Sequence, residues 1–440
     1  MKSAPLPSPP RPAIVAVEMG YGHLRPAHAL AELLGGSVLE ADRPPLADAA
    51  EQRTWARTRR AFETLTRLSQ RRVVGPALSP LLAAITAIPP LDDRDRTRAT
   101  WPVHLVERLA ARGLGRGLVD HLRTTGAPLL TTFFVPALVA DRARDLPDAT
   151  TIGCVVTDSD INRVWVPPQP RATRIRYFAP STRVVDRLVS YGVPAERITL
   201  TGFPLPHALL GGPSLDAAKA NLHHRLARLD SAGAFRHRCG DKVARRLGPL
   251  PPADGPPRLA FAVGGAGAQA ELADRFIPSL APLVRAGRLH LRLIAGVRRE
   301  VAARFSRAVD AAGLGAHVGG AVEILHTGDV ASYFRAFNAA LADTDILWTK
   351  PSELVFFGAL GLALVLAPPV GEHERMNAGW ALEHGAALRQ HAPKAAAGWL
   401  AGWLADGTLA ETAWRAFRAL PQQGLYDIAA RFSSSAAPSR

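Results

Sequence analysis

The chain has 440 residues, of which 48% are hydrophobic and 21% charged, and a formal net charge of +15. This is the composition of a globular protein, and it excludes fibrous and broadly disordered classes. The length exceeds that of one ordinary core, so two domains are expected. The positive charge favours acidic partners such as nucleic acid, anionic lipid or phosphorylated substrates. A genome composition rich in Arg and Ala explains the excess equally well.

The only two cysteines, Cys154 and Cys239, are far apart, and no histidine cluster has the spacing of a metal site. The sequence therefore predicts no disulfide framework, metal or cofactor, and it fits a reducing cytoplasm. The Pro-rich residues 5–12 are not followed by the apolar run of a signal peptide. No uncharged apolar stretch approaches the roughly 18 residues of a membrane span. We expect a cytoplasmic protein, with any membrane contact peripheral and on the inner face.

Short apolar runs alternate with amphipathic stretches along the chain. In the first half, strands are predicted at residues 13–17, 128–134, 151–156 and 198–201, and a helix at 24–34. In the second half, strands are predicted at 258–263, 289–295, 322–325, 344–347 and 362–367, with helices between them. Brief strands separated by helices of about ten or more residues indicate parallel sheets. We therefore expect an α/β fold with two Rossmann-like, doubly wound domains.

The boundary between these domains is predicted in residues 206–257. This segment begins and ends in stretches rich in Pro and Gly, and its residues 214–229 are expected to form a basic helix. The predicted domains are residues 1–205 and 258–410. Residues 411–440 are expected to form helices that pack back on the first domain, followed by a disordered tail.

Gly20, Gly22 and His23 lie directly after the first strand and before a helix. Glycines let the backbone turn sharply and approach a ligand, and a helix N-terminus offers N–H groups to an anion. His23 is then expected at the carboxyl edge of the sheet, where doubly wound folds bind ligands. A plain strand-to-helix turn with a capping histidine is the structural alternative.

A second polar segment follows the strand predicted at 151–156. It contains Asp158, Asp160, Asn162 and Trp165. Carboxylates at the end of a buried strand can hold a substrate hydroxyl and receive its proton. The alternative is that Asp158 only caps the next turn.

A glycine-rich turn connects the strand predicted at 258–263 to a helix expected from about Ala268. It consists of Gly264, Gly265, Ala266 and Gly267. Small residues, N–H groups and a helix dipole directed at negative charge can cradle a diphosphate. No Walker lysine follows, which disfavours a P-loop nucleoside triphosphatase. An ordinary strand-to-helix turn is the alternative.

The last polar segments flank the strand predicted at 362–367. They contain Lys350, Ser352 and Glu353 before that strand and His373, Glu374 and Asn377 after it. Polar groups at this density beside a buried strand suit the binding of sugar hydroxyls. A solvated helix is the alternative for the later group.

In this order and spacing, the four segments resemble the inverting GT-B glycosyltransferases of family 28. That family includes monogalactosyldiacylglycerol synthases, processive diacylglycerol glucosyltransferases and the N-acetylglucosaminyltransferase of the peptidoglycan lipid precursor. The resemblance also includes residues 176–204, and it covers 13–35, 128–204 and 258–390, about half of the chain. It implies two Rossmann-like domains facing across a cleft, with a UDP-sugar donor bound mainly by the C-terminal domain.

The chain departs from the family at specific positions. Asn162 replaces a His beside the acceptor, and His373 replaces a Gln that contacts the sugar. When the chain is aligned with the family at Gly361, the ribose-binding Glu of the family falls on Phe356. When it is aligned at Gly358, that Glu falls on Glu353, and both assignments stay open. These departures leave a catalytically inactive nucleotide-sugar-binding relative as one alternative.

The resemblance implies a single displacement with inversion at the anomeric carbon, from the donor to a hydroxyl acceptor. Asp158 is the first candidate for general base, with His23 as its partner or as a phosphate contact. The diphosphate would be bound by Gly264, Gly265, Ala266, Gly267 and Lys350 without a metal. The sugar and nucleotide contacts would be Ser352, Glu353, His373, Glu374 and Asn377, and the acceptor side Gly20, Gly22, Asp160, Asn162 and Trp165.

Residues 52–90 bear on whether the acceptor is a lipid. Arginines alternate there with Trp55, Phe62, Leu65 and Leu68, and residues 77–88 are nearly free of polar groups. A basic amphipathic helix followed by an apolar one is typical of contact with an anionic membrane surface. A domain helix whose apolar stripe faces the core fits equally well.

A nucleotide-sugar epimerase or hydrolase of the same fold is the rival enzyme, because it would act on the donor without an acceptor. Nucleic acid is not predicted as a partner, since no recognised reader module accompanies the positive charge. The sequence predicts no particular oligomeric state.

Overall fold

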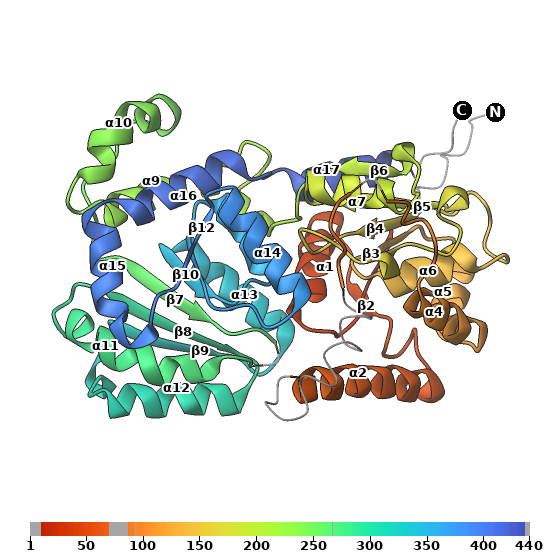
Figure 1. The fold of residues 1–440 in the computed structure, drawn as a ribbon, viewed down its shortest axis with the longest axis horizontal. Coiled ribbons are helices and arrows are strands. Elements are labelled where there is room, and N and C mark those ends of the chain that lie inside the picture. The colour runs from red at the N-terminus through yellow and green to blue at the C-terminus, as the bar shows by residue number, and fades with distance from the viewer. Residues whose placement is uncertain (1–9, 70–86, 93, 266, 436–440) are drawn as a thin grey trace, which may run out of the picture. The chain divides into compact units, whose positions relative to one another are not determined.

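The computed structural model describes residues 10–69, 87–92, 94–265 and 267–435; side chains at 59, 61–69 and 433–435 lie outside the described set. Unit 1 is Met1–Pro204 with Gln423–Arg440, and unit 2 is Leu205–Gln422. Each unit contains a sheet of six parallel strands with helices on both sides (Figure 1). The prediction of an α/β fold with two doubly wound domains, the domain plan of the GT-B class, is confirmed.

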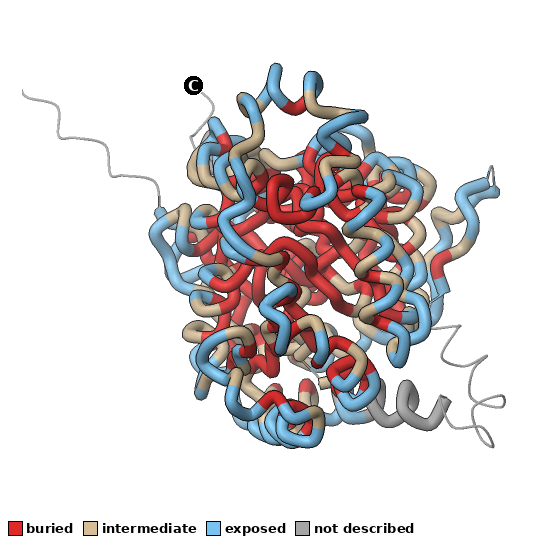
Figure 2. Tube along the Cα trace, turned by 90° about the vertical axis from the view of Figure 1, so that its left-hand side faces the viewer, coloured by how far each residue is buried: buried red, intermediate tan, exposed pale blue. Residues whose placement is uncertain are grey.

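The sheet of unit 1 has the strand order β2-β1-β3-β4-β5-β6. The strands are β1 (Ala13–Ala16), β2 (Val38–Glu40), β3 (Leu129–Thr131), β4 (Ile152–Val155), β5 (Ile175–Ala179) and β6 (Ile198–Leu200). Every residue of β1, β3 and β4 is buried. Parallel strands covered on both faces are continuous apolar runs for this reason. Figure 2 colours the buried residues of the chain red.

Seven helices of unit 1 are described. They are α1 (Tyr21–Leu34), α2 (Ala49–Ser69), α4 (Trp101–Ala111), α5 (Arg116–Thr125), α6 (Phe134–Arg142), α7 (Thr182–Ser190) and α17 (Gly424–Ser435). Short 3-10 turns at Arg163–Trp165, Pro170–Ala172 and Ala195–Arg197 complete the connections. Ser181 caps α7, because its Oγ accepts a hydrogen bond from the Val184 N–H at 3.2 Å.

The last helix, α17, returns to the sheet of unit 1. The ring of Phe432 lies 6.4 Å from that of Phe178. A Cβ atom on Gly153 of β4 would lie 2.7 Å from the Phe432 ring, so only glycine leaves room for α17 at that point of the sheet. The preceding helix, α16 (Thr408–Ala419), remains in unit 2.

The sheet of unit 2 has the strand order β12-β11-β10-β7-β8-β9. The strands are β7 (Arg258–Ala262), β8 (His290–Gly296), β9 (Val322–His326), β10 (Ile346–Thr349), β11 (Ala363–Leu366) and β12 (Ala387–Arg389). The helices between and after them are α11 (Ala273–Arg285), α12 (Arg299–Ala311), α13 (Val330–Ala342), α14 (Glu372–Glu383) and α15 (Ala396–Ala405), with 3-10 helices at Ala270–Leu272, Gly315–His317, Glu353–Leu360 and Pro393–Ala395.

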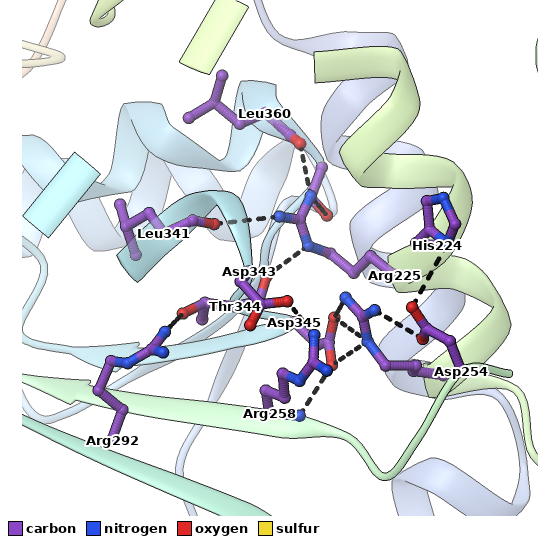
Figure 3. Close-up of polar contacts among 12 residues, drawn as sticks. His224, Arg225, Asp254, Arg258, Arg292, Leu341, Asp343, Thr344, Asp345 and Leu360 are labelled. Carbon is purple, nitrogen blue, oxygen red and sulfur yellow. Dashed lines mark hydrogen bonds and ion pairs between the residues drawn. The ribbon is translucent and has the colours of Figure 1, made fainter. Parts of the chain in front are cut away.

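The segment predicted as a linker forms α8 (His207–Leu210), α9 (Asp216–Leu229) and α10 (Ala234–Leu247), and all three belong to unit 2. Arg225 fixes α9, because its guanidinium donates hydrogen bonds to the carbonyl oxygens of Thr344 at 2.7 Å and Leu360 at 2.8 Å (Figure 3). Burial lowers the pKa of Arg225 to about 10.

Arg228 forms the second anchor of α9. Its Nη2 lies 2.7 Å from Oδ1 of Asp345, and both side chains are almost completely buried. Burial alone would lower the pKa of Arg228, but the hydrogen bonds with Asp345 outweigh it and raise the pKa. Removing one partner of a buried ion pair typically costs about 3–5 kcal/mol. The basic helix is therefore part of the core of unit 2.

Each predicted strand corresponds to an observed one, but the sequence missed three. β2 and β12 are edge strands of three residues, and β5 has the exposed Arg176 in its apolar run. The strand predicted at 128–134 ends at Thr131, because α6 begins at Phe134. Within the described ranges, no helix combines the length and apolar character that crossing a bilayer requires.

Candidate functional site

Each sheet has a point where its strand order reverses. In unit 1 it lies between β1 and β3, and in unit 2 between β7 and β10. The loops after such a pair of strands lead away to opposite sides and leave a crevice at the carboxyl ends, which is where doubly wound folds bind ligands. The predicted segments beginning at Gly20 and Gly264 follow β1 and β7, and the segment beginning at Lys350 follows β10.

His23 occupies the reversal point of unit 1, in the first turn of α1. Gly20 precedes this helix with φ of 104°, a conformation that favours glycine, and no side chain caps the helix. The Nδ1 atom of His23 lies 2.9 Å from the carbonyl oxygen of Thr132 and 3.0 Å from Oγ1 of Thr157. A carbonyl oxygen only accepts hydrogen bonds, so this contact places a proton on Nδ1, and in the neutral imidazole the lone pair is then on Nε2.

Aromatic rings surround the imidazole of His23. The ring of Phe133 meets it edge-on at 4.7 Å, and the ring of Trp165 lies 6.3 Å away. Trp165 is buried and also packs against Phe134 at 5.5 Å. The structure therefore brings two predicted residues, His23 and Trp165, together. It adds the ring of Phe133 and the hydroxyl of Thr157, which were not predicted as site residues.

The two carboxylates of the segment after β4 differ in their surroundings. Asp158 is half-buried and directly follows Thr157, the residue whose hydroxyl contacts His23. Asp160 is 2% exposed, and its oxygens accept hydrogen bonds from Nε and Nη2 of Arg187 at 2.8 and 2.9 Å. Burial would lower the pKa of Arg187, but these bonds raise it. Asp160 thus anchors its loop to α7, and the acceptor contact predicted for it stays a prediction.

The glycine-rich turn follows β7 at the reversal point of unit 2. The Gly267 N–H donates to the carbonyl oxygen of Gly264 at 2.7 Å, and Gly267 has φ of 70°. Ala266 lies outside the described residues. The helix expected from Ala268 begins later, as a 3-10 turn from Ala270 that continues into α11.

Lys350 follows β10 and lies over this turn. A Cβ atom on Gly264 would approach the Lys350 Cε to 2.6 Å, so the absence of a side chain at Gly264 makes room for the lysine. The Lys350 Nζ is 2.5 Å from Oε1 of Glu374, and the other oxygen of Glu374 accepts the Val370 N–H at 2.8 Å. Glu374 is 2% exposed. Both of its oxygens therefore hold Lys350 and the loop before α14, and the sugar contact predicted for Glu374 stays a prediction.

A second cation, Arg298, reaches the same turn from the end of β8. Its Nε donates to the carbonyl oxygen of Gly265 at 2.5 Å, and its side chain packs on Gly267. Its Nη1 is 3.3 Å from the carboxylate of Glu300. Sequence reasoning missed Arg298, although it follows a predicted strand that neighbours β7 in the sheet. The glycine turn consequently has two basic side chains, and the sequence had predicted only Lys350.

The remaining predicted donor contacts lie on the elements after β10 and β11. Ser352 caps the 3-10 helix Glu353–Leu360, and Glu353 is buried in its first turn. Phe356, the other candidate for the ribose position, packs in the core at 5.0 Å from the ring of Trp380. The ring of His373 lies close to Gly371, and Asn377 is completely buried.

The segment predicted to touch a membrane is described only in part. In α2 the side chain of Trp55 is buried, whereas Arg53, Arg57 and Arg60 are exposed. The apolar stretch at 77–88 lies almost entirely outside the described residues, as do the side chains of Phe62, Leu65 and Leu68. No group of three or more His, Cys, Asp or Glu side chains in the described part of the chain is arranged to hold a metal ion.

No protein-family model matches the chain, and no curated protein matches it in sequence. Solved structures similar to it include MurG of Acinetobacter baumannii, 14% identical with a TM-score of 0.49 over 96% of this chain and 98% of that one. The UDP-GlcNAc 2-epimerase of Neisseria meningitidis, bound to UDP-GlcNAc, is 11% identical with a TM-score of 0.45 over 95% of this chain and 97% of that one.

The glycosyltransferase SnogD of Streptomyces nogalater is also similar, at 14% identity and a TM-score of 0.44 over 96% of this chain and 98% of that one. These structures include both a glycosyltransferase and an epimerase.

Proposed function

We propose that the chain is an inverting glycosyltransferase that moves a sugar from a nucleotide diphosphate donor, a UDP-sugar, to a hydroxyl acceptor. The observation that carries the proposal is the reversal point of unit 2. There a glycine turn without side-chain bulk lies beneath the ammonium of Lys350 and beside the guanidinium of Arg298. This is a place where backbone N–H groups and two fixed positive charges can meet a diphosphate.

These groups would act on the leaving group. As the bond from the anomeric carbon to the donor phosphate breaks, negative charge grows on the terminal phosphate. Cations already held in position stabilise that charge without reorganising during the reaction. Glu374 fixes Lys350 and the Gly265 carbonyl fixes Arg298. Because the chain supplies these charges itself, the proposed transfer is metal-independent.

Unit 1 would supply the acceptor side. His23 presents Nε2 as the nitrogen with a lone pair, so it can take the proton of the acceptor hydroxyl as that oxygen attacks the anomeric carbon. We therefore propose His23 as the general base. Asp158 was the first candidate for this role from the sequence. Asp158 then remains a candidate for orienting the acceptor, together with Gly20, Gly22, Asn162 and Trp165.

The other donor contacts proposed are Ser352, Glu353, His373 and Asn377, for the sugar and the nucleotide. Their position supports this proposal, because they follow β10 and β11 at the carboxyl ends of the strands, which is the edge of the sheet where the glycine turn lies. A lipid acceptor, and a peripheral position on an anionic membrane, remain proposals that rest on the exposed arginines of α2. Flotation with anionic vesicles at low salt tests them, and an absence of binding would count against both.

The central experiment has two stages. Calorimetry with nucleoside diphosphates and their sugars identifies the donor, with Lys350→Gln as the site variant and the exposed Arg307→Gln as a control. Product analysis then follows the donor with and without acceptor mixtures, in buffer containing EDTA. We expect acceptor-dependent transfer that EDTA does not reduce. Isomerised or hydrolysed donor in the absence of any acceptor would favour an epimerase or hydrolase, and binding without turnover an inactive relative.

A further inference from the structure

Unit 2 has another cationic region, formed by α10 and α16. A hollow of about 290 Å³ is lined by Lys242, Arg245 and Arg246 of α10 and by Trp414 and Arg418 of α16. The three residues of α10 follow the i, i+3, i+4 spacing that puts side chains on one helix face. All three are exposed, whereas Phe235 and Val243 are the buried residues of this helix. Four positive charges therefore share one hollow.

These four cations form no ion pair with a carboxylate anywhere in the described ranges. Arg238, on the same helix, shows the contrast, because its Nη2 lies 3.3 Å from the carboxylate of Glu411. Arg246 and Arg418 instead lie over aromatic rings, at 5.9 Å from the centre of Phe417 and 5.8 Å from that of Trp414. The rings hold the two guanidinium groups in place without neutralising them.

Helix dipoles account for only part of this arrangement. Arg245 and Arg246 are in the last turn of α10, and Arg418 is in the last turn of α16. A helix C-terminus is equivalent to roughly half a negative charge. Two such ends offset about one of the four positive charges. A surplus of positive charge thus remains in the hollow, and an anion would neutralise it.

Trp414 provides an independent sign of a missing ligand. Its side chain is 3% exposed, and its indole Nε1 is buried without a hydrogen-bond partner among the described residues. A buried N–H donor left unpaired is unfavourable, so such groups nearly always have an acceptor. Trp414 lines the hollow, and we infer that a ligand oxygen bound there becomes this acceptor when the indole ring turns its N–H toward it.

We propose that this hollow binds a phosphate group, either free or as a phosphomonoester. A phosphate ester of this kind carries a charge of about −1.5 to −2 at neutral pH and three strong acceptor oxygens. Guanidinium groups match those oxygens in pairs, and Trp414 adds a neutral donor. The proposal does not depend on the proposed transferase activity, because the hollow is lined by α10 and α16 and not by the loops after β7 and β10.

Inorganic phosphate is the first probe, titrated calorimetrically into the full chain. The pocket variant is Arg245→Gln with Arg246→Gln. The control is Arg307→Gln with Arg335→Gln, which removes the same charge from exposed arginines of α12 and α13. The original chain, the pocket variant and the control are each also prepared with Lys350→Gln, so that the proposed donor site does not contribute to phosphate binding. We expect phosphate to bind about tenfold or more weakly to the pocket variant and unchanged to the control.

The indole signals of the eight tryptophans give a second measurement. Phosphate is expected to shift the signal that disappears in Trp414→Phe. Vesicles of phosphatidylcholine with and without phosphatidic acid then distinguish a lipid headgroup from a soluble phosphate. Binding to the vesicles that contain phosphatidic acid, if the pocket variant loses it, identifies a lipid headgroup. Binding of inorganic phosphate without binding to these vesicles identifies a soluble ligand. The proposal is overturned if neither probe binds, or if the pocket variant and the control bind both equally.

Discussion

The reversal points of the two sheets have the same topology and different chemistry. At the first, between β1 and β3, a single histidine is enclosed by the rings of Phe133 and Trp165, and its Nδ1 is bound to Thr132 and Thr157. At the second, between β7 and β10, the turn at Gly264 is bordered by two basic side chains, Lys350 and Arg298.

The difference shows how much of each site is set by the sheet and how much by the loops. The sheet determines where ligands bind, because the crevice lies where the strand order reverses. The loops determine which ligands bind. An imidazole among aromatic rings suits proton transfer, whereas an uncrowded backbone turn with cations suits a diphosphate. Substitutions at the two points should therefore separate turnover from donor binding.

The largest effect is expected at the first point. His23→Asn should lower the turnover number by about 10²–10⁴-fold, the usual contribution of a general base. Donor affinity should stay within about twofold, because His23 belongs to unit 1 and the proposed diphosphate contacts to unit 2. Initial rates with saturating donor and calorimetry with UDP measure the two quantities separately.

Asp158→Asn is the matched comparison for His23. It removes one carboxylate charge from the neighbouring loop and keeps its size. We expect a smaller loss of turnover than with His23→Asn. If Asp158→Asn abolishes transfer and His23→Asn retains it, Asp158 is the base, as the sequence first indicated.

The next largest effect is expected at the second point, from Gly264→Ala. The added methyl group would lie 2.6 Å from the Lys350 Cε, so the lysine must move away from the turn. UDP should bind about tenfold or more weakly, with turnover at saturating donor less affected. Gly398→Ala is the control, because no atom lies within 4 Å of its added Cβ and it is in the helix α15. Unchanged UDP binding in Gly264→Ala would show that Lys350 does not contact the diphosphate.

The fold was predictable because parallel strands buried on both faces are continuous apolar runs. β4 and β10 have this property, and the sequence located both. The short edge strands β2 and β12 lack it, since each has only three residues and few of them are buried. The basic helix α9 was recognised, but its burial was not, because nothing near Arg225 in the sequence reveals the distant carbonyl oxygens of Thr344 and Leu360.

The candidate site shows a similar division. The glycine turns and His23 were found because they follow predicted strands directly. The partners of each side chain were not, because they come from elements far away in the sequence. Thr132 and His23 are 109 residues apart, and Lys350 and Glu374 are 24 apart. The structure pairs Asp160 with Arg187 and Glu374 with Lys350, and the ligand contacts predicted for these two carboxylates stay predictions.

A smaller effect is expected from Arg298→Gln. Its guanidinium is partly exposed, so solvent reduces its attraction for a diphosphate. UDP should bind about three- to tenfold more weakly, and the loss should shrink at high salt because exposed charges are screened. The exposed Arg307→Gln, on the adjacent α12, removes the same charge farther along the helix and should leave affinity unchanged. An equal loss of UDP affinity in both variants would show that Arg298 acts only through the overall charge of the protein.

The smallest effect is expected from Glu374→Ala, and it decides between two roles. If Glu374 positions Lys350, the variant should weaken UDP and the UDP-sugar by the same factor, about two- to tenfold for a lost hydrogen-bonded partner. If Glu374 contacts the sugar, only the UDP-sugar should bind more weakly. Glu374→Gln is an intermediate case, because its single amide oxygen can accept from Lys350 or from the Val370 N–H but not from both, and its NH2 group then faces the other donor. If Glu374 positions Lys350, that variant should therefore weaken UDP and the UDP-sugar by the same factor, and by less than Glu374→Ala does.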